Sequence, residues 1–319
     1  DLWLKDDTRN PSGSFKDRVV TIALSAGRAL GITTFACAST GNLANSVAAH
    51  TAAWGVPSYV FIPHDLERGK VVGSAIYGTN LVSVKGTYDD VNRLCAEVAD
   101  AKGWGFVNVN LRAFYAEGSK SLGFEIAEQL GWQLPDHVVG PLASGSMFSK
   151  IGKGFGELVR YGLVDDTPVR FSGAQATGCS PIAAAWERDS LDISPQKPDT
   201  IARSLAIGNP ADGYYALKLA KESGGAVGHV PDDEIVAGIR LLAETEGLFA
   251  ETAGGVTVAN LKRFAESGHV DPDERVVAII SGHGMKTLEA VEPHVGPTFE
   301  VTPSFDDFSS RLTDQSEEN

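Results

Sequence analysis

Residues 4–18 read LKDDTRNPSGSFKDR, and this stretch sets the interpretation of the rest of the chain. It begins with a strand-like segment and passes into a turn formed by Pro11 and Gly13. Ser14, followed three positions later by Asp17, has the spacing of a capping box at a helix N-terminus. Apolar residues then recur at helical spacing. The stretch therefore predicts a strand, a turn and the first residues of a helix.

Lys16 falls in the first turn of this predicted helix. A cation is electrostatically unfavourable there, because the helix dipole favours anions at the N-terminus. A lysine amine in such a place suits Schiff-base chemistry, which requires an uncharged nucleophile. Taken alone, however, a lysine at a helix start is more simply a solvated surface charge.

Strand-like and helix-like segments alternate along the chain, which predicts an α/β fold with open parallel sheets covered by helices. Residues 275–281 (RVVAIIS) form an apolar run typical of a central strand buried on both faces. A strand is expected at 106–109 and a helix at 117–130. The segment 189–209 predicts a long loop or lid over a site, and the polar, acidic segment 298–319 is expected to fray.

The composition excludes several function classes. The chain of 319 residues has 27 Lys and Arg against 41 Asp and Glu, a net charge of -14, which argues against nucleic-acid and anionic-membrane surfaces. Cys37, Cys95 and Cys179 form no CxxC pair, so neither a disulfide scaffold nor a metal site is expected. No apolar run approaches the roughly 18 residues of a membrane span. The chain begins without Met, and an N-terminal piece is expected to be missing.

Three strand-to-helix junctions carry small polar residues, and ligands bind at such junctions in parallel sheets. The first suits a carboxylate or phosphate at a helix N-terminus and comprises Ser39, Thr40, Gly41 and Asn42. The second could close backbone amides on a phosphate and comprises Ala143, Ser144, Gly145, Ser146 and Met147. In the third, Ser281 to Gly284, His283 is better explained as a turn residue than as a catalytic base, and Ser281 is the better placed side chain.

Together these segments resemble the threonine synthase branch of the pyridoxal-phosphate (PLP) β-family, which has the tryptophan synthase β-like fold. The resemblance implies that Lys16 of SFKDR carries the cofactor PLP. Asn42 would bond the cofactor's ring oxygen, and the backbone of residues 39–42 would hold the substrate carboxylate. The loop 143–147 (ASGSM) resembles the cofactor-phosphate loop.

The last two segments extend the resemblance to the cofactor ring. The sequence SGHGMK resembles the family segment TGHGLK, so Ser281 would bond the pyridine nitrogen. A neutral hydroxyl there, in place of an Asp, is expected to leave that nitrogen unprotonated. Residues 251–255 (ETAGG) resemble a family segment that lines the ring.

The activity implied is a lyase reaction in which O-phospho-L-homoserine loses phosphate from its γ-carbon and water adds at Cβ, giving L-threonine. Substrate phosphate would be bound by Arg112, Ser119 and Lys120, within a segment similar to the family's phosphate strip. This segment departs from the family pattern, because Tyr115 stands where other threonine synthases carry an arginine. Lys16 would act as the general base that moves the Cα and Cβ protons.

The resemblance further implies a smaller domain at about residues 30–135 and a larger cofactor domain formed by residues 1–29 and 136–319. A homodimer acting in the cytoplasm on a small phosphorylated amino acid is expected. Alternatives within the family are a cysteate synthase-like enzyme and a threonine or serine dehydratase-like enzyme. A catalytically silent metabolite sensor and a Rossmann-type dinucleotide binder are the alternatives from other classes, although no GxGxxG motif supports the latter.

Overall fold

The computed structural model describes residues 1–39, 41–64, 68–86 and 88–318. The chain divides into two compact units, Asp1–Lys286 and Thr287–Asn319, and each is described by itself. The predicted division of the first unit at residues 30 and 135 stays a prediction.

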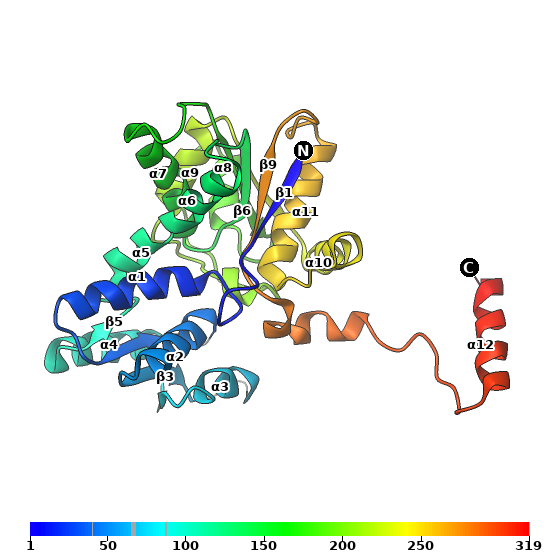
Figure 1. Ribbon diagram of the computed structural model, residues 1–319, viewed down its shortest axis with the longest axis horizontal. Helices are drawn as coiled ribbons and strands as arrows, with labels where there is room; N and C mark the ends of the chain where they lie inside the picture. The colour runs from blue at the N-terminus through cyan, green and yellow to red at the C-terminus, as the bar shows by residue number, and fades with distance from the viewer. Residues whose placement is uncertain (40, 65–67, 87, 319) are drawn as a thin grey trace. The chain divides into compact units, whose positions relative to one another are not determined.

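A five-stranded sheet in the order β1-β9-β6-β7-β8 forms the centre of the first unit, and all of its strands pair in parallel. Its strands are β1 (Leu2–Asp6), β6 (His137–Pro141), β7 (Arg170–Ala176), β8 (Val227–Val230) and β9 (Val276–Ile280). The predicted central strand is β9, every residue of which is buried between β1 and β6. Helices cover both faces of this sheet (Figure 1).

A second parallel sheet has the order β4-β3-β2-β5. Its strands are β2 (Phe35–Ala38), β3 (Ser58–Pro63), β4 (Asn80–Val84) and β5 (Gly105–Phe106). The strand expected at 106–109 was wrong in its extent. The chain turns after Phe106, because the Val109 amide donates to the Phe106 carbonyl and the Asn110 side chain accepts from the Phe106 amide. The expected fold class, α/β with two open parallel sheets covered by helices, is confirmed.

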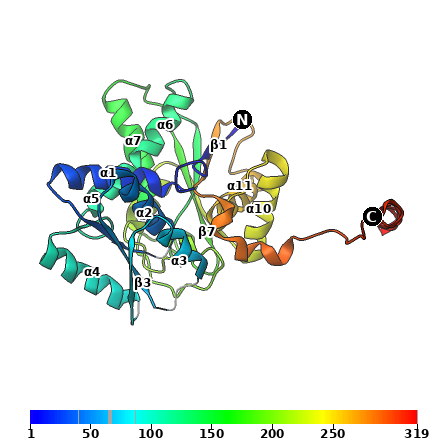
Figure 2. The same ribbon diagram turned by 60° about the horizontal axis from the view of Figure 1, so that its bottom comes forward.

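The helices of the first unit are α1 (Lys16–Ala29), α2 (Asn42–Trp54), α3 (Arg68–Ala75), α4 (Tyr88–Lys102), α5 (Arg112–Gly118), α6 (Lys120–Gln129), α7 (Ser146–Arg160), α8 (Pro181–Glu187), α9 (Gly213–Glu222), α10 (Asp232–Glu246) and α11 (Thr252–Glu266). Helix α1 packs against α2 and α5, and α6 packs against α7. Helices α10 and α11 lie side by side, and α11 contacts β9 (Figure 2).

The helix expected at 117–130 is instead two helices. At Ser119 the backbone hydrogen bonds change from the four-residue spacing of an α-helix to a three-residue spacing. The Ser119 amide donates to the Ala116 carbonyl, and the Leu122 amide donates to the Ser119 carbonyl. The preceding residue, Gly118, lies so close to α1 that a Cβ would be 2.8 Å from the Val19 Cα. The expected long loop at 189–209 is confirmed, with one 3₁₀ turn at Arg203–Leu205 (η1). Its role as a lid stays a prediction.

The second unit contains two 3₁₀ turns, η3 (Leu288–Ala290) and η4 (Glu292–His294), and the helix α12 (Phe305–Glu318). The segment that was expected to fray, 298–319, contains the helix α12, and its fraying stays a prediction. Asp307 accepts hydrogen bonds from the amide and hydroxyl of Thr302, both at 2.7 Å, and this stabilises the helix start. Among the described residues, no helix is both long and apolar enough to cross a membrane.

Candidate active site

The turn before α1 lies against the carboxyl end of β9. The Phe15 amide donates to the Ser281 carbonyl at 2.8 Å, and the His283 amide donates to the Gly13 carbonyl at 3.0 Å. Gly13 has φ of 71°, in the left-handed region that favours glycine. These bonds bring the Lys16 segment and the Ser281 segment together, as parallel-sheet topology leads one to expect.

Asp17 fixes the start of α1. Its buried carboxylate accepts from the Ser12 amide and hydroxyl, both at 2.7 Å, from the Ser46 hydroxyl at 2.6 Å and from His50 at 3.1 Å. The expected capping box was wrong, because the carboxylate binds Ser12 and two residues of α2 in place of the Ser14 amide. Burial alone would raise the pKa of Asp17, but these hydrogen bonds outweigh it and hold the pKa below its ordinary value.

The Lys16 amine lies between two aromatic rings. Its Nζ is 4.6 Å from the ring centroid of Phe15 and 5.6 Å from that of Tyr115. The side chain is half-buried, and within the part of the chain that the structure describes Lys16 makes no ion pair. An amine held by ring faces and not by a carboxylate remains available to a reacting carbonyl.

Glu251 joins the two sheets at the site. It is 2% exposed, lies directly before α11, and accepts from the Asn42 amide at 2.9 Å and from the Ser281 hydroxyl at 3.3 Å. Its own amide donates to the Gly282 carbonyl at 2.8 Å. A Cβ on Gly282 would lie 2.5 Å from Oε1 of Glu251, so a larger residue at this position would displace the carboxyl group. Asn42 and Ser281 are therefore brought together through one carboxyl group.

Burial raises the pKa of Glu251, against hydrogen bonds from Asn42 and Ser281 and the charges of Lys286 and Lys16. Lys286 lies in the 3₁₀ turn η2 (Gly284–Lys286), and burial lowers its pKa against the charges of Glu251 and Asp17. The site thus contains a second lysine that the sequence did not single out.

The loop before α2 carries the proposed carboxylate-binding residues. Gly41 is the N-cap of α2, and its amide is 3.4 Å from the Ser39 hydroxyl. Ser39 is half-buried, and its own amide donates to the Phe61 carbonyl. Thr40 lies outside the described residues.

The loop 143–147 leads into the N-terminus of α7. Gly145 is the N-cap and has φ of 89°, so no side-chain oxygen from the N-cap position occupies the first-turn amides. A Cβ on Gly145 would lie 2.6 Å from the Asp212 carbonyl oxygen. Ala143, Ser144 and Met147 are half-buried, and Ser146 is buried. At this glycine-capped helix start the Ser146 amide lies 3.4 Å from the Ser144 hydroxyl, and first-turn amides of this kind can bind an anion.

The three candidate phosphate residues have different surroundings. Arg112 is 49% exposed at its side chain and pairs with Asp212 at 2.9 Å. Lys120 is held by Glu117 at 2.7 Å and by Glu157 at 2.8 Å. Ser119 is buried, and its hydroxyl has no hydrogen-bond partner within the described ranges.

Comparisons with known proteins decide the family. The family profile described as "Pyridoxal-phosphate dependent enzyme" matches residues 1–282. The chain is 39% identical to the threonine synthase of Methanocaldococcus jannaschii and 36% identical to that of Methanosarcina acetivorans, in both cases over 91% of this chain and 72% of the relative. The chain belongs to the threonine synthase family of PLP-dependent enzymes.

Solved structures agree with the family at the level of the fold. Maize serine racemase aligns with a TM-score of 0.75 at 18% identity, covering 99% of this chain and 88% of that one. Threonine deaminase isoform 2 from Solanum lycopersicum aligns with a TM-score of 0.74 at 19% identity, covering 92% and 83%.

The residues of this threonine synthase family member fit its cofactor, PLP. Lys16 offers an amine without an ion pair among the described residues, and Gly145 leaves the start of α7 open to a phosphate. Asn42 and Ser281 present neutral polar groups that can meet ring atoms. This donor set matches what PLP requires, namely a lysine, an anion site and hydrogen bonds to its ring.

Sequence reasoning missed one member of the site, Lys286, and understated two others, Tyr115 and Glu251. Tyr115 was noticed only as a departure from the family pattern, yet its ring lies beside Lys16. Lys286 carried no signal beyond its place in SGHGMK. Glu251 was named only as part of a ring-lining segment, although an acid preceding a helix rich in small residues could have suggested a buried position. His283 lies directly before the turn η2, and its Nδ1 accepts from the Met285 amide at 3.1 Å; its interpretation as a turn residue stays a prediction.

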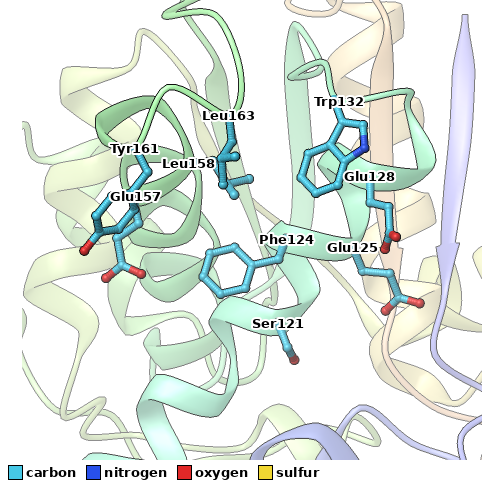
Figure 3. A pocket seen from close by; sticks show the side chains of 9 residues that line it. All are labelled: Ser121, Phe124, Glu125, Glu128, Trp132, Glu157, Leu158, Tyr161 and Leu163. Carbon is cyan, nitrogen blue, oxygen red and sulfur yellow. The ribbon is translucent and has the colours of Figure 1, made fainter.

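A cavity of about 550 Å³ lies between α6 and α7, and none of the candidate active-site residues line it (Figure 3). Phe124, Trp132 and Tyr161 give it aromatic walls, and three glutamates line it as well. It contains none of the predicted site residues. Among the described residues, no cluster of three or more His, Cys, Asp or Glu side chains could hold a metal ion.

Proposed function

We propose that this enzyme converts O-phospho-L-homoserine and water into L-threonine and phosphate. The observation that carries the proposal is the identity of 39% and 36% to two proteins named threonine synthase, each matched along 91% of this chain. The gathering of Lys16, Asn42 and Ser281 around Glu251 supports it, because these are the positions that the family motifs assign to the cofactor.

Each candidate residue has a place in this proposal. Lys16 would hold the cofactor, Asn42 its ring oxygen and Ser281 its ring nitrogen. The loop 143–147 would hold the cofactor phosphate through backbone amides at the start of α7. The backbone of residues 39–42 would hold the substrate carboxylate in the same manner at the start of α2.

The bound cofactor supplies electron withdrawal from the amino acid's α-carbon. The protein's own contribution is proton transfer and orientation. The Lys16 amine is proposed to take the Cα proton and then the Cβ proton. Phe15 and Tyr115 restrict where this amine can move, since their rings lie 4.6 Å and 5.6 Å from Nζ. Phosphate would leave Cγ with the electron pair of the Cγ–O bond once the Cβ proton has been removed, and a proton would be returned to Cγ. Water would then add its hydroxyl at Cβ, and return of a proton to Cα would complete L-threonine.

Binding of the substrate phosphate has a cost at both proposed cations. Arg112 must exchange its bond with Asp212 for the phosphate, and Lys120 must share an ammonium group that already meets two carboxylates. Ser119 could donate without such an exchange, because its hydroxyl has no partner within the described ranges. Because the Ser119 hydroxyl is buried and Lys120 already meets two carboxylates, we place Arg112 first among the three as a phosphate ligand.

The test is phosphate release and product analysis with three substrates, O-phosphohomoserine, O-phosphoserine and threonine. Release of phosphate with formation of threonine from O-phosphohomoserine alone is the expected result. Turnover of threonine alone, to an oxo acid and ammonia, would reject the proposal in favour of a dehydratase. The Lys16→Ala variant should lose both colour and turnover, whereas Lys218→Ala, an exposed lysine on α9, should keep both.

We also propose that the enzyme acts in the cytoplasm as a homodimer, as the family resemblance implies. Light scattering coupled to size-exclusion chromatography measures the mass of the particle and therefore its oligomeric state. A mass equal to one chain of 33.7 kDa at assay concentrations would reject it.

A further inference from the structure

The Glu251 carboxyl is the point at which two predicted cofactor contacts meet. Its Oε2 accepts from the Asn42 amide at 2.9 Å, and its Oε1 accepts from the Ser281 hydroxyl at 3.3 Å. Asn42 begins α2 beside the four-stranded sheet, whereas Ser281 follows β9 of the five-stranded sheet. A single buried group therefore orients both side chains.

The Asn42 contact selects one amide orientation. The amide nitrogen has two protons, and one of them is donated to Glu251. The second remains to be donated to another acceptor, such as the ring oxygen of the cofactor. With the amide turned over, its oxygen would face Oε2 of Glu251, and no proton would lie between the two oxygens whether the carboxyl is ionised or carries its proton on Oε1.

The Ser281 contact depends on where one proton lies. A serine hydroxyl has a single proton, and when Glu251 is ionised this proton is donated to Oε1. The hydroxyl can then only accept from a ring nitrogen, so the nitrogen must carry a proton to be bonded. When Glu251 is protonated, the carboxyl can donate to Ser281, and the hydroxyl proton is free for an unprotonated nitrogen.

We propose that Glu251 is a positioning residue that holds Asn42 and Ser281 and, through the direction of its hydrogen bond to Ser281, sets the protonation of the cofactor's ring nitrogen. The proposal rests on the proposed placement of the cofactor ring between Asn42 and Ser281. It does not depend on which amino acid is the substrate. An unprotonated nitrogen, as the family resemblance implies, requires a protonated Glu251.

The surroundings of Glu251 favour the protonated form. The carboxyl is 2% exposed, and burial without water is unfavourable for its charge. Two cations oppose this effect, Lys286 from the turn after β9 and Lys16 from α1. Neither makes an ion pair of 4.0 Å or less with Glu251 among the contacts of the described residues, and Lys286 is also attracted by Asp17.

The test uses the resting holoenzyme with PLP labelled with ¹⁵N in the ring and no substrate. In the wild type, the ring ¹⁵N chemical shift is expected to move with pH as Glu251 titrates, together with the cofactor's absorption. Glu251→Gln, which cannot ionise, should hold one shift, that of an unprotonated nitrogen, from pH 6 to pH 9. Glu251→Ala should weaken PLP binding to the apoprotein about tenfold, because Asn42 and Ser281 lose their common partner.

Matched variants separate the effect of the hydrogen bond between Glu251 and Ser281 from general effects of substitution on the protein. Glu266→Gln, at the opposite end of α11, should behave as wild type in every measurement. Ser281→Ala should abolish the response of the ring ¹⁵N shift to pH while Glu251 is intact. The proposal is overturned if the wild type and Glu251→Gln share one pH dependence, or if Ser281→Ala leaves it in place.

These readouts distinguish the inference from the proposed reaction. A holoenzyme that shows the expected spectra but does not release phosphate from O-phosphohomoserine would support the role of Glu251 and reject the substrate assignment. A wild type that binds no PLP would overturn the cofactor placement and the role of Glu251 with it.

Discussion

The Asp17 carboxylate accepts a hydrogen bond from the Ser46 hydroxyl at 2.6 Å. Asp17 follows Lys16 directly on α1, and Ser46 lies one turn after Asn42 on α2. Because Asp17 and Ser46 tie the two helices at this point, Lys16, the proposed cofactor lysine, and the amide of Asn42 have a fixed relation. Asp17 is thus the structural link between the two helices on which the site depends.

Asp17→Asn should destabilise the enzyme by about 2–4 kcal/mol, because several hydrogen bonds to a charged group are weakened. The folded pKa of Asp17 lies below its unfolded value, so its contribution is complete above the unfolded pKa and is lost as pH falls through the folded pKa. Urea denaturation at pH 7 measures the loss. Asp166→Asn, an exposed control, should be neutral, and an Asp17→Asn variant as stable as this control would contradict the expectation.

Gly145→Ala should weaken PLP binding at least tenfold and cost about 1–3 kcal/mol of stability. The residue has φ of 89°, and the added Cβ would meet the Asp212 carbonyl at 2.6 Å. Gly156 on the same helix has open space at its Cβ, so Gly156→Ala should be neutral or stabilising by up to about 1 kcal/mol. Apoprotein titration with PLP and thermal unfolding compare the two. Equal PLP affinities would show that the loop does not hold the cofactor phosphate.

The sequence predicted those features that depend on local pattern and sheet topology. The apolar run before Ser281 had to be a central strand, since a strand buried on both faces shows no alternation. The segments of Lys16 and Ser281 meet because β1 and β9 are parallel neighbours, which places their carboxyl ends at one edge.

Features that depend on the packing of distant elements were not accessible in this way. Asp17 has the spacing of a capping residue, yet its partners lie on α2, and no local pattern distinguishes the two arrangements. The contact between Asn42 and Glu251 requires the relative placement of two sheets, which periodicity does not contain. The position of Tyr115 likewise depends on how a short helix packs against α1.

His137 should make the enzyme sensitive to acid. This residue is fully buried at the start of β6, and burial lowers its pKa to about 4. The charges of Arg170 and His269 also lower the pKa of His137, whereas the charge of Glu274 raises it. Below the unfolded pKa of about 6.5 the unfolded chain binds a proton that the folded enzyme does not, so stability falls between about pH 6.5 and pH 4.

The expected loss from this one residue is about 2 kcal/mol between pH 7.5 and pH 5. Urea denaturation at the two pH values measures it in the wild type and in His137→Gln. The variant should be less stable at pH 7.5, where the bond to Ser172 at 2.7 Å is disturbed, but should lose less on acidification. The exposed control His294→Gln should keep the wild-type slope. Identical slopes in all three proteins would contradict the assignment.

Tyr115→Ala should lower kcat roughly three- to fivefold and should also lower stability, because the ring packs against the hydrophobic core. The ring centroid lies 5.6 Å from the Lys16 amine, and a cation–π contact of this kind contributes about 0.5–1 kcal/mol. Tyr115→Phe keeps the ring and should stay within about twofold of wild type on the same physical grounds. Steady-state phosphate release from O-phosphohomoserine measures both variants. If Tyr115→Phe were as impaired as Tyr115→Ala, the hydroxyl and not the ring face would be the group that matters, and Tyr115 would then act as a donor to the substrate.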